Sequence, residues 1–308
     1  MGLYEQIARN KRRSVVLITA FAVLVFAVAA AFDYVVGWGP IGLIAAAAFA
    51  LCSTAGAYWT SDTVALSMSR ARSADEEEYR QLHNIVEGLA IAAGLPKPRV
   101  YIVDDPAPNA FATGRNPEHS AVAVTTGLLE KMNRVELEGV LAHELSHIKD
   151  YDILVSTIAV TMVGVIALLA DWGVRSLWWG GGRRGRDNDN GNNALALVLA
   201  VVAIVLLILS PLIAQLMQAA VSRRRESMAD VEGVNLTRYP PGLISALEKL
   251  KEDRTVVATA STATAHLWIE SPLARTPEEG KFSRLNRMFD THPDLDERIE
   301  KLKALGAA

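Results

Sequence analysis

The chain has 308 residues, of which 51% are hydrophobic and 21% charged, and its net charge is −3 at pH 7. This composition excludes collagen-like, disulfide-rich and intrinsically disordered proteins, and it offers no basic surface for a nucleic-acid partner. A mean hydropathy of +0.20 is high for a soluble domain, and the apolar excess is concentrated in four long segments.

Each of the four apolar segments is long enough to cross a membrane as a helix. They cover residues 15–32, 39–59, 153–171 and 194–214. About 20 apolar residues cross a hydrocarbon core of about 30 Å, so we predict four transmembrane helices arranged in two hairpins. A cleaved signal peptide is the alternative for the first segment, because Ala29, Ala30 and Ala31 resemble a cleavage site. We favour a retained helix, since the apolar stretch exceeds the usual length and a second span follows closely.

Basic residues beside the spans predict a multi-pass protein of the cell (inner) membrane with both termini in the cytoplasm. By the positive-inside rule, the basic clusters before the first span and after the fourth lie inside; they are Arg9, Lys11, Arg12 and Arg13, and Arg223, Arg224 and Arg225. The flexible, glycine-rich loop 175–193 departs from the rule. It contains several arginines, although alternation of the spans places it outside.

A polar region between the second and third spans is predicted to contain both helices and strands. Ser73 and Glu76 form a capping-box pattern for a helix that ends near Ala93, before Gly94. Three β-like runs follow at 99–104, 109–113 and 120–126, and they predict a small antiparallel sheet with an edge strand. Asn133 and Glu136 cap the next helix, and no proline interrupts it before residue 171. One long helix could therefore carry this segment and the third span.

That helix contains the pattern H-E-x-x-H, formed by His143, Glu144 and His147. The spacing of four residues places both imidazoles on one face, where they can bind one Zn²⁺. Glu144 could accept the proton of a water that the metal activates and return it to a leaving amine. The pattern is short and also occurs by chance, in which case the two histidines are simply solvated.

The third metal ligand must come from elsewhere in the chain. No histidine follows His147 closely enough for a metzincin arrangement, but Glu226 and Asp230 come directly after the fourth span. Glu226 could complete a site of two histidines and one glutamate, with Asp230 accepting a hydrogen bond from a ligand imidazole. The alternative is an ordinary charged helix end below a membrane span.

Taken together, these motifs resemble the HtpX family of membrane-integrated zinc metalloproteases and, more distantly, the type-1 CAAX prenyl proteases. The matching features are N-A-F-A-T-G at 109–114, V-T-T-G-L-L at 124–129, H-E-L-S-H at 143–147, E-S-M-A-D at 226–230, T-A-H-L at 264–267, and His292-Pro293 with Arg298. With the four spans and their order, they cover nearly the whole chain.

The resemblance implies a gluzincin-like endopeptidase at the cytoplasmic face that serves membrane-protein quality control and the stress response. It implies one Zn²⁺ per chain, held by His143, His147 and Glu226, with Glu144 as general base. It also implies that His292 and Arg298 steady the oxyanion or the Glu226 side of the site. The alternative for this pair is a helix that starts at Pro293 and carries Arg298 on a solvated face.

The segment Asn109, Ala110, Phe111 and Ala112 is a candidate substrate-binding strand. An edge strand beside the zinc helix would let an extended peptide pair with it through main-chain hydrogen bonds. The alternative is a purely structural hairpin. His266 is interpreted as a packing residue.

The sequence thus predicts a mainly α-helical, multi-pass membrane protein with an α+β catalytic domain in two parts. Residues 1–60 and 153–222 form the transmembrane hairpins, and residues 61–152 and 223–308 form the catalytic domain. The expected partners are membrane or misfolded protein substrates and the lipid bilayer. A prenyl-protein protease is a neighbouring alternative, although we expect four spans to be too few to enclose an intramembrane chamber. A transporter would place ionisable residues near the bilayer midplane and show repeated, interrupted helices. A metal-binding scaffold would leave Glu144 without a role.

Overall fold

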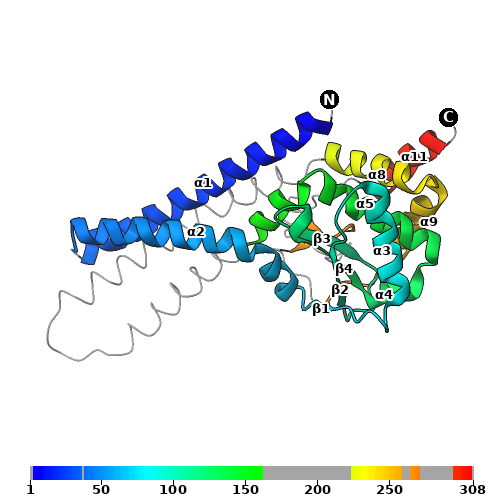
Figure 1. Cartoon of the computed structure of the whole chain (residues 1–308), viewed down its shortest axis with the longest axis horizontal. Coiled ribbons are helices and arrows are strands. Elements are labelled where there is room, and N and C mark those ends of the chain that lie inside the picture. The colour runs from blue at the N-terminus through cyan, green and yellow to red at the C-terminus, as the bar shows by residue number, and fades with distance from the viewer. Residues whose placement is uncertain (1–2, 37, 162–222, 259–263, 271–293, 307–308) are drawn as a thin grey trace, which may run out of the picture.

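The computed structural model describes residues 3–36, 38–161, 223–258, 264–270 and 294–306. In these ranges the chain forms a helical hairpin that projects from a domain built of helices and a small sheet (Figure 1). The mainly helical character predicted from the sequence is confirmed. The expected spans at 153–171 and 194–214, the loop 175–193 and His292 lie largely or wholly outside the described residues.

The hairpin consists of α1 (Leu3–Val36) and α2 (Pro40–Met68). Among the described residues, two segments are long and apolar enough to cross a membrane, Ile7–Ala30 and Pro40–Met68. They correspond to the first two predicted spans. The N-terminal end of α1 lies beside this domain, whereas the turn between α1 and α2 lies far from it (Figure 1).

The sheet has four strands in the order β1-β2-β4-β3. The strands are β1 (Arg72–Ser73), β2 (Arg99–Val103), β3 (Ala110–Gly114) and β4 (Ser120–Thr125). The prediction of a wholly antiparallel sheet is wrong, because β2 and β4 are parallel. The hairpin of β3 and β4 inserts β4 next to β2, so β3 becomes the edge strand.

The helix that follows β1 is α3 (Arg80–Ala93), and Gly94 in the left-handed conformation ends it as expected. The predicted capping box of Ser73 and Glu76 is wrong, since Ser73 belongs to β1 and pairs with Tyr101 of β2. The backbone N–H groups of Glu77 and Glu78 instead donate to Asp75 Oδ1, which forms a turn before the helix.

The central helix of the domain is α5 (Arg134–Lys149), preceded by the short α4 (Thr126–Lys131). The predicted capping box is present: Asn133 Oδ1 accepts from Glu136 N, and Glu136 Oε2 accepts from Asn133 N. The prediction of one continuous helix from here into the third span is wrong. The chain leaves the helix at Asp150, Tyr151 takes a φ of 60°, and a separate helix starts at Asp152.

Three further helices pack around α5 to complete the domain. They are α8 (Arg223–Thr237), α9 (Pro240–Glu252) and α11 (Leu295–Gly306). The main core lies between these helices, α3 and one face of the sheet, and Val140, Leu141 and Leu145 of α5 are fully buried in it. The opposite face of the sheet packs Phe111 against Trp268, with ring centroids 4.7 Å apart. The α5 helix is therefore held on several sides.

Glu136 joins the start of α5 to α9, because it accepts hydrogen bonds from Ser245 (2.6 Å) and Lys249 (2.6 Å) as well as closing the capping box. Burial of the carboxyl opposes ionisation, but these donors hold the pKa of Glu136 below its ordinary value. Its stabilising contribution is therefore present at neutral pH and is lost as the pH falls below the unfolded-state pKa of about 4.3 towards the lower folded-state pKa.

We predict that Glu136→Ala lowers the free energy of unfolding by about 1–3 kcal/mol, because it removes part of a helix cap and leaves two partly buried donors, Ser245 and Lys249, without their acceptor. Thermal unfolding of the detergent-purified protein at neutral pH would measure the loss. Glu138→Ala is the matched control, since Glu138 pairs with Arg134 at the surface of the same helix. Equal effects of the two variants would contradict this account of the α5 cap.

Candidate active site

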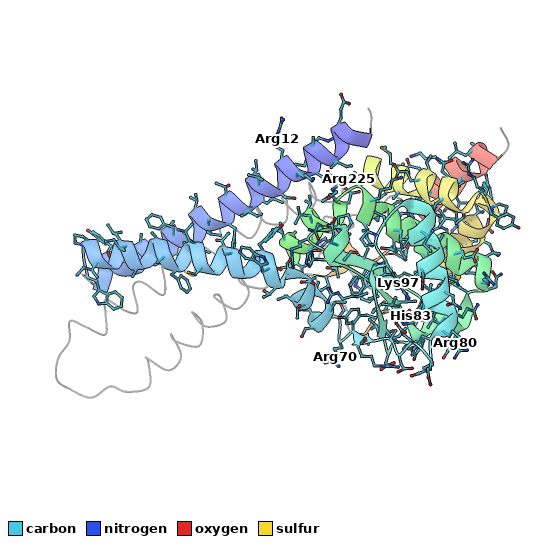
Figure 2. The ribbon with its side chains drawn as sticks, viewed as in Figure 1. Arg12, Arg70, Arg80, His83, Lys97 and Arg225 are labelled. Atoms are coloured by element: carbon cyan, nitrogen blue, oxygen red, sulfur yellow. The ribbon has the colours of Figure 1, made fainter. Side chains whose placement is uncertain are left out.

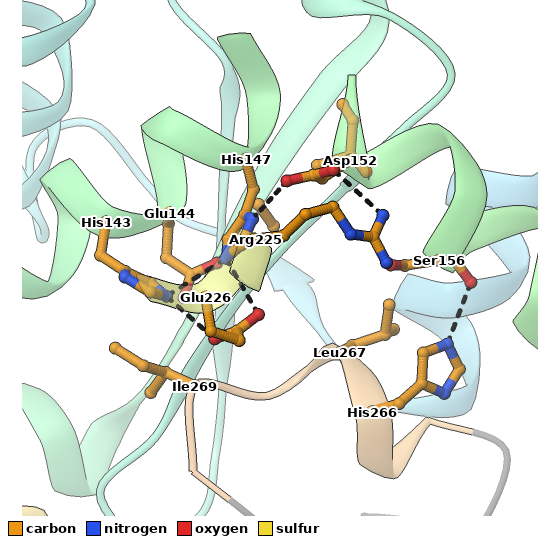
Figure 3. Close-up of a pocket in the computed structure, with 12 residues that line it drawn as sticks. His143, Glu144, His147, Asp152, Ser156, Arg225, Glu226, His266, Leu267 and Ile269 are labelled. Carbon is orange, nitrogen blue, oxygen red and sulfur yellow. Dashed lines mark hydrogen bonds and ion pairs between the residues drawn. The ribbon is translucent and has the colours of Figure 1, made fainter. Parts of the chain in front are cut away.

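The α5 helix brings His143 and His147 to the same side, one turn apart. His143 is 1% exposed and Glu144, between the two histidines in sequence, is 2% exposed. The two Nε2 atoms are 3.2 Å apart. The helix thus presents two imidazole nitrogens to one point inside the domain (Figure 3).

The α8 helix supplies carboxylates to this point. Glu226 Oε2 is 3.6 Å from His143 Nε2, and Glu226 Oε1 is 3.5 Å from His147 Nε2. The two helices approach closely at Gly233, where a Cβ atom would stand 3.0 Å from the backbone nitrogen of His143. A side chain at position 233 would therefore push the Glu226 helix away from the histidine helix.

The spacing of these three ligand atoms fits a tetrahedral zinc site. Zinc bonds to imidazole nitrogen and carboxylate oxygen of about 2.0–2.2 Å imply ligand atoms about 3.3 Å apart. The observed separations of 3.2, 3.5 and 3.6 Å bracket that value. His143, His147 and Glu226 also form the group of potential metal ligands found among the described residues. They could hold one metal ion and leave the remaining tetrahedral position for water or substrate.

An aspartate and an arginine support His143 from behind. His143 Nδ1 lies 2.9 Å from Asp230 Oδ1. Asp230 therefore accepts a hydrogen bond from the Nδ1–H group, which leaves the lone pair of Nε2 available to a metal. Asp230 in turn accepts two hydrogen bonds from Arg298, from Nε at 2.9 Å and from Nη2 at 2.7 Å. Burial opposes ionisation of Asp230, but Arg298 and His143 lower its pKa to about 2. The aspartate is therefore ionised at physiological pH.

His147 has a similar support that the sequence analysis did not identify. Its Nδ1 lies 3.2 Å from Asp152 Oδ2, and Arg225 Nη1 donates to Asp152 Oδ1 at 3.0 Å (Figure 3). Burial opposes protonation of the ring, but Glu226 and Asp152 raise the pKa of His147 to about 9. A site that stabilises positive charge this strongly is suited to a metal cation, which would displace the proton.

Glu144 lines the same pocket as the three potential ligands. Its charge contributes to the raised pKa of His147, which indicates that the carboxylate lies close to the metal position. Ala112 of β3, Leu267 and Ile269 form the apolar part of the wall. A carboxylate beside a potential metal site, in a pocket with one apolar wall, can act as a general base towards a water that attacks a bound peptide.

The candidate substrate-binding strand β3 is partly covered by the chain itself. The Ile269 N–H donates to the Ala110 carbonyl, and Asn109 Nδ2 donates to the Glu270 carbonyl at 3.0 Å. Phe111 is fully buried against Trp268. Of the four predicted residues, Ala112 is the one that lines the pocket.

Arg298 is 1% exposed, so the alternative that placed it on a solvated face is wrong. Besides Asp230, it binds the Ile269 carbonyl at 3.1 Å and approaches His143 Nδ1 to 3.5 Å. Arg298 therefore connects α11 to His143 and to the segment 268–270 that covers β3. His266, interpreted as a packing residue, is buried in the pocket wall, where Nε2 lies 3.1 Å from the Ser156 carbonyl oxygen.

Comparison with known proteins agrees with this site. The model of peptidase family M48 matches residues 76–305, and the chain belongs to this family of metallopeptidases. Curated relatives include a protease HtpX homolog of Caldanaerobacter subterraneus subsp. tengcongensis, 45% identical over 98% of both chains. Another is the protease HtpX homolog of Lactiplantibacillus plantarum, 47% identical over 98% of this chain and 99% of the relative. The resemblance to HtpX proteases is thus confirmed.

A solved structure shares the fold at lower identity. The crystal structure of S. mikatae Ste24p has a TM-score of 0.50 and 16% sequence identity, and the match covers 97% of this chain and 67% of that chain. The likeness concerns the fold alone.

We predict that Asp230→Asn weakens Zn²⁺ binding about 10–100-fold, because the amide cannot hold the His143 ring and Arg298 as the carboxylate does. Competition with a chromophoric chelator would measure the dissociation constant. Asp296→Asn is the matched control, since Asp296 is exposed on α11 and pairs with Lys251. Wild-type affinity in Asp230→Asn would contradict the supporting role of this aspartate.

Proposed function

We propose that the protein is a membrane-integrated, zinc-dependent endopeptidase that hydrolyses peptide bonds of membrane or misfolded proteins at the cytosolic face. The observation that carries the proposal is the convergence of two imidazole Nε2 atoms and one carboxylate beside Glu144 in a single pocket. Membership of peptidase family M48 supplies the reaction class. The names of the HtpX relatives support a protease, and the assignment to protein quality control follows from the family resemblance.

In this proposal His143, His147 and Glu226 bind one Zn²⁺ per chain. When bound, the ion polarises the scissile carbonyl and lowers the pKa of a water towards about 7. Glu144 accepts the proton of the attacking water. It then donates this proton to the amine nitrogen as the C–N bond breaks, which returns Glu144 to its ionised form.

Arg298 serves this mechanism as a positioning residue. Both of its bonds to Asp230 and its bond to the Ile269 carbonyl occupy the guanidinium, which favours support of His143 over direct contact with an oxyanion. Asp230 keeps its role behind His143. For His292, a contribution to oxyanion stabilisation stays a prediction from the family resemblance.

The substrate is proposed to bind as an extended strand against β3, with Ala112 nearest the metal position. The neighbouring residues Asn109, Ala110 and Phe111 fix the strand, because they bind or pack against Trp268, Ile269 and Glu270. Main-chain pairing tolerates many sequences, which suits an enzyme for damaged or misassembled proteins.

We propose that the protein has all four membrane spans predicted from the sequence, including the two candidate spans described above. Residues 1–60 and 153–222 then form the two transmembrane hairpins, and residues 61–152 and 223–308 form the catalytic domain. The basic residues near the start of α1 and α8 support a cytoplasmic position for the catalytic domain. Placing the active site at this face gives it access to cytosolic loops of membrane proteins.

Glu144→Gln is expected to retain Zn²⁺ and to lose peptide hydrolysis by at least about 10²-fold, because the amide cannot accept the proton of water. Cleavage of a casein-like substrate by the detergent-purified protein, with metal content determined in parallel, would measure both effects. Chelation should abolish wild-type cleavage and added Zn²⁺ should restore it. Stoichiometric zinc without chelator-sensitive cleavage would instead indicate a metal-binding scaffold.

The topology is testable by cysteine accessibility in a Cys52→Ser background. Asp296→Cys, on the exposed face of α11, should react with a membrane-impermeant maleimide only after the cells are permeabilised. Trp38→Cys, between α1 and α2, should react in intact spheroplasts, because the proposed arrangement places this turn outside. The reverse labelling pattern would refute the cytosolic assignment without affecting the proposed chemistry.

A further inference from the structure

The N-terminal helix α1 reaches the support of the metal site through one polar side chain. Asn10 is 1% exposed, near the end of the candidate span Ile7–Ala30 that lies beside the catalytic domain. Its Nδ2 donates to Asp152 Oδ1 at 2.6 Å and to the Asp150 carbonyl at 3.0 Å. Asp150 and Asp152 are 140 and 142 positions away from Asn10 in the sequence.

The chemistry of its neighbours fixes the orientation of the Asn10 amide. A carboxylate and a carbonyl oxygen can only accept hydrogen bonds here, so the amide nitrogen must face them. In the described part of the chain, Asn10 Oδ1 is buried and has no hydrogen-bond partner. A buried asparagine with one unpaired atom is a costly way to pack a helix, which indicates that its donor group serves another purpose.

Asp152 is the residue on which several elements meet. Its Oδ2 faces His147 Nδ1, while its Oδ1 accepts from Asn10 of α1 and from Arg225 of α8. Figure 2 shows Arg225 on the side of the domain that faces α1, whereas Arg12 projects away from it. The two donors on Oδ1 leave Oδ2 to orient the imidazole.

Apolar packing keeps α1 in this position. Leu17 and Phe21 of α1 are buried against Leu154, Val155 and Ile158, which follow Asp152 in its helix. Lys11 also lies over the ring of Tyr151, with Nζ 4.2 Å from the centroid. The contact between Asn10 and Asp152 therefore lies at the end of an extended interface.

We propose that Asn10 is a positioning residue of the metal site, so that the first membrane helix sets the metal affinity of the catalytic domain through Asp152 and His147. This inference rests on the proposed function. Because substitution of groups that orient metal ligands typically costs 10–100-fold in metal affinity, we expect the more remote Asn10 to contribute about 5-fold or more.

The test measures the Zn²⁺ dissociation constant of the full-length protein in detergent by chelator competition. Asn10→Leu keeps the side-chain volume, removes the donor, and should weaken binding about 5-fold or more. Asn10→Asp keeps the shape but sets a carboxylate against Asp152, and should weaken binding at least as much. Ser14→Ala is the matched control, because Ser14 is equally buried on the next turn of α1 and donates to the Asn10 carbonyl within the same helix.

A double-mutant cycle with Asp152→Ala separates positioning from general packing. If Asn10 acts through Asp152, adding Asn10→Leu to Asp152→Ala should cause no further loss of zinc affinity. Wild-type affinity in Asn10→Leu, or an undiminished effect of Asn10→Leu without Asp152, would overturn the inference while leaving the proposed function intact. A wild-type protein that binds no zinc would instead refute both.

Discussion

The arrangement of the site depends on how the two histidines are held from their outer nitrogens. Asp230 binds Nδ1 of His143 and Asp152 lies against Nδ1 of His147, so both Nε2 atoms point inwards. Without these aspartates each ring could rotate, or carry its proton on the wrong nitrogen. The helix α5 alone therefore supplies the spacing of the histidines but not their orientation.

A buried arginine binds each of the two aspartates, so both histidines have the same kind of support. Arg298 from α11 binds Asp230, and Arg225 from α8 binds Asp152. Four carboxylates (Glu144, Asp152, Glu226 and Asp230) lie within one buried region, where unpaired negative charges would be very unfavourable. The two arginines offset part of this charge, and a divalent cation would offset the rest. Charge balance thus connects elements from the middle and the C-terminal part of the chain.

Sequence reasoning succeeded where the controlling interactions are local. The capping box of Asn133 and Glu136, the helix end at Gly94 and the spacing of the H-E-x-x-H motif each depend on a few neighbouring residues. The same reasoning misassigned Ser73, because its pairing with Tyr101 is decided by a strand that comes much later. The parallel pairing of β2 with β4 was missed for the same reason, since it depends on which strand the β3–β4 hairpin places inside.

The site follows the same division. The sequence predicts Glu226 and Asp230 as a remote ligand and its support from their spacing and their position after a span, and the structure places both beside the histidines. Asp152 was not found, because five residues after His147 is the wrong spacing for a contact on a continuous helix. The helix breaks at Tyr151, and this break allows Asp152 to contact His147. Neither glycine nor proline marks the break in the sequence. Arg225 and Asn10 contact the site through Asp152, so their contributions could not be predicted from the sequence either.

The cover over β3 also bears on the solubility of the catalytic domain. All five residues of β3 are buried, and most are apolar, although the strand lies at the edge of the sheet. Such an edge, if open, would template pairing with other copies of the chain and promote aggregation. The hydrogen bond from Ile269 and the side chain of Trp268 close its first half. Self-association through this edge is thereby discouraged, while the end at Ala112 stays beside the pocket.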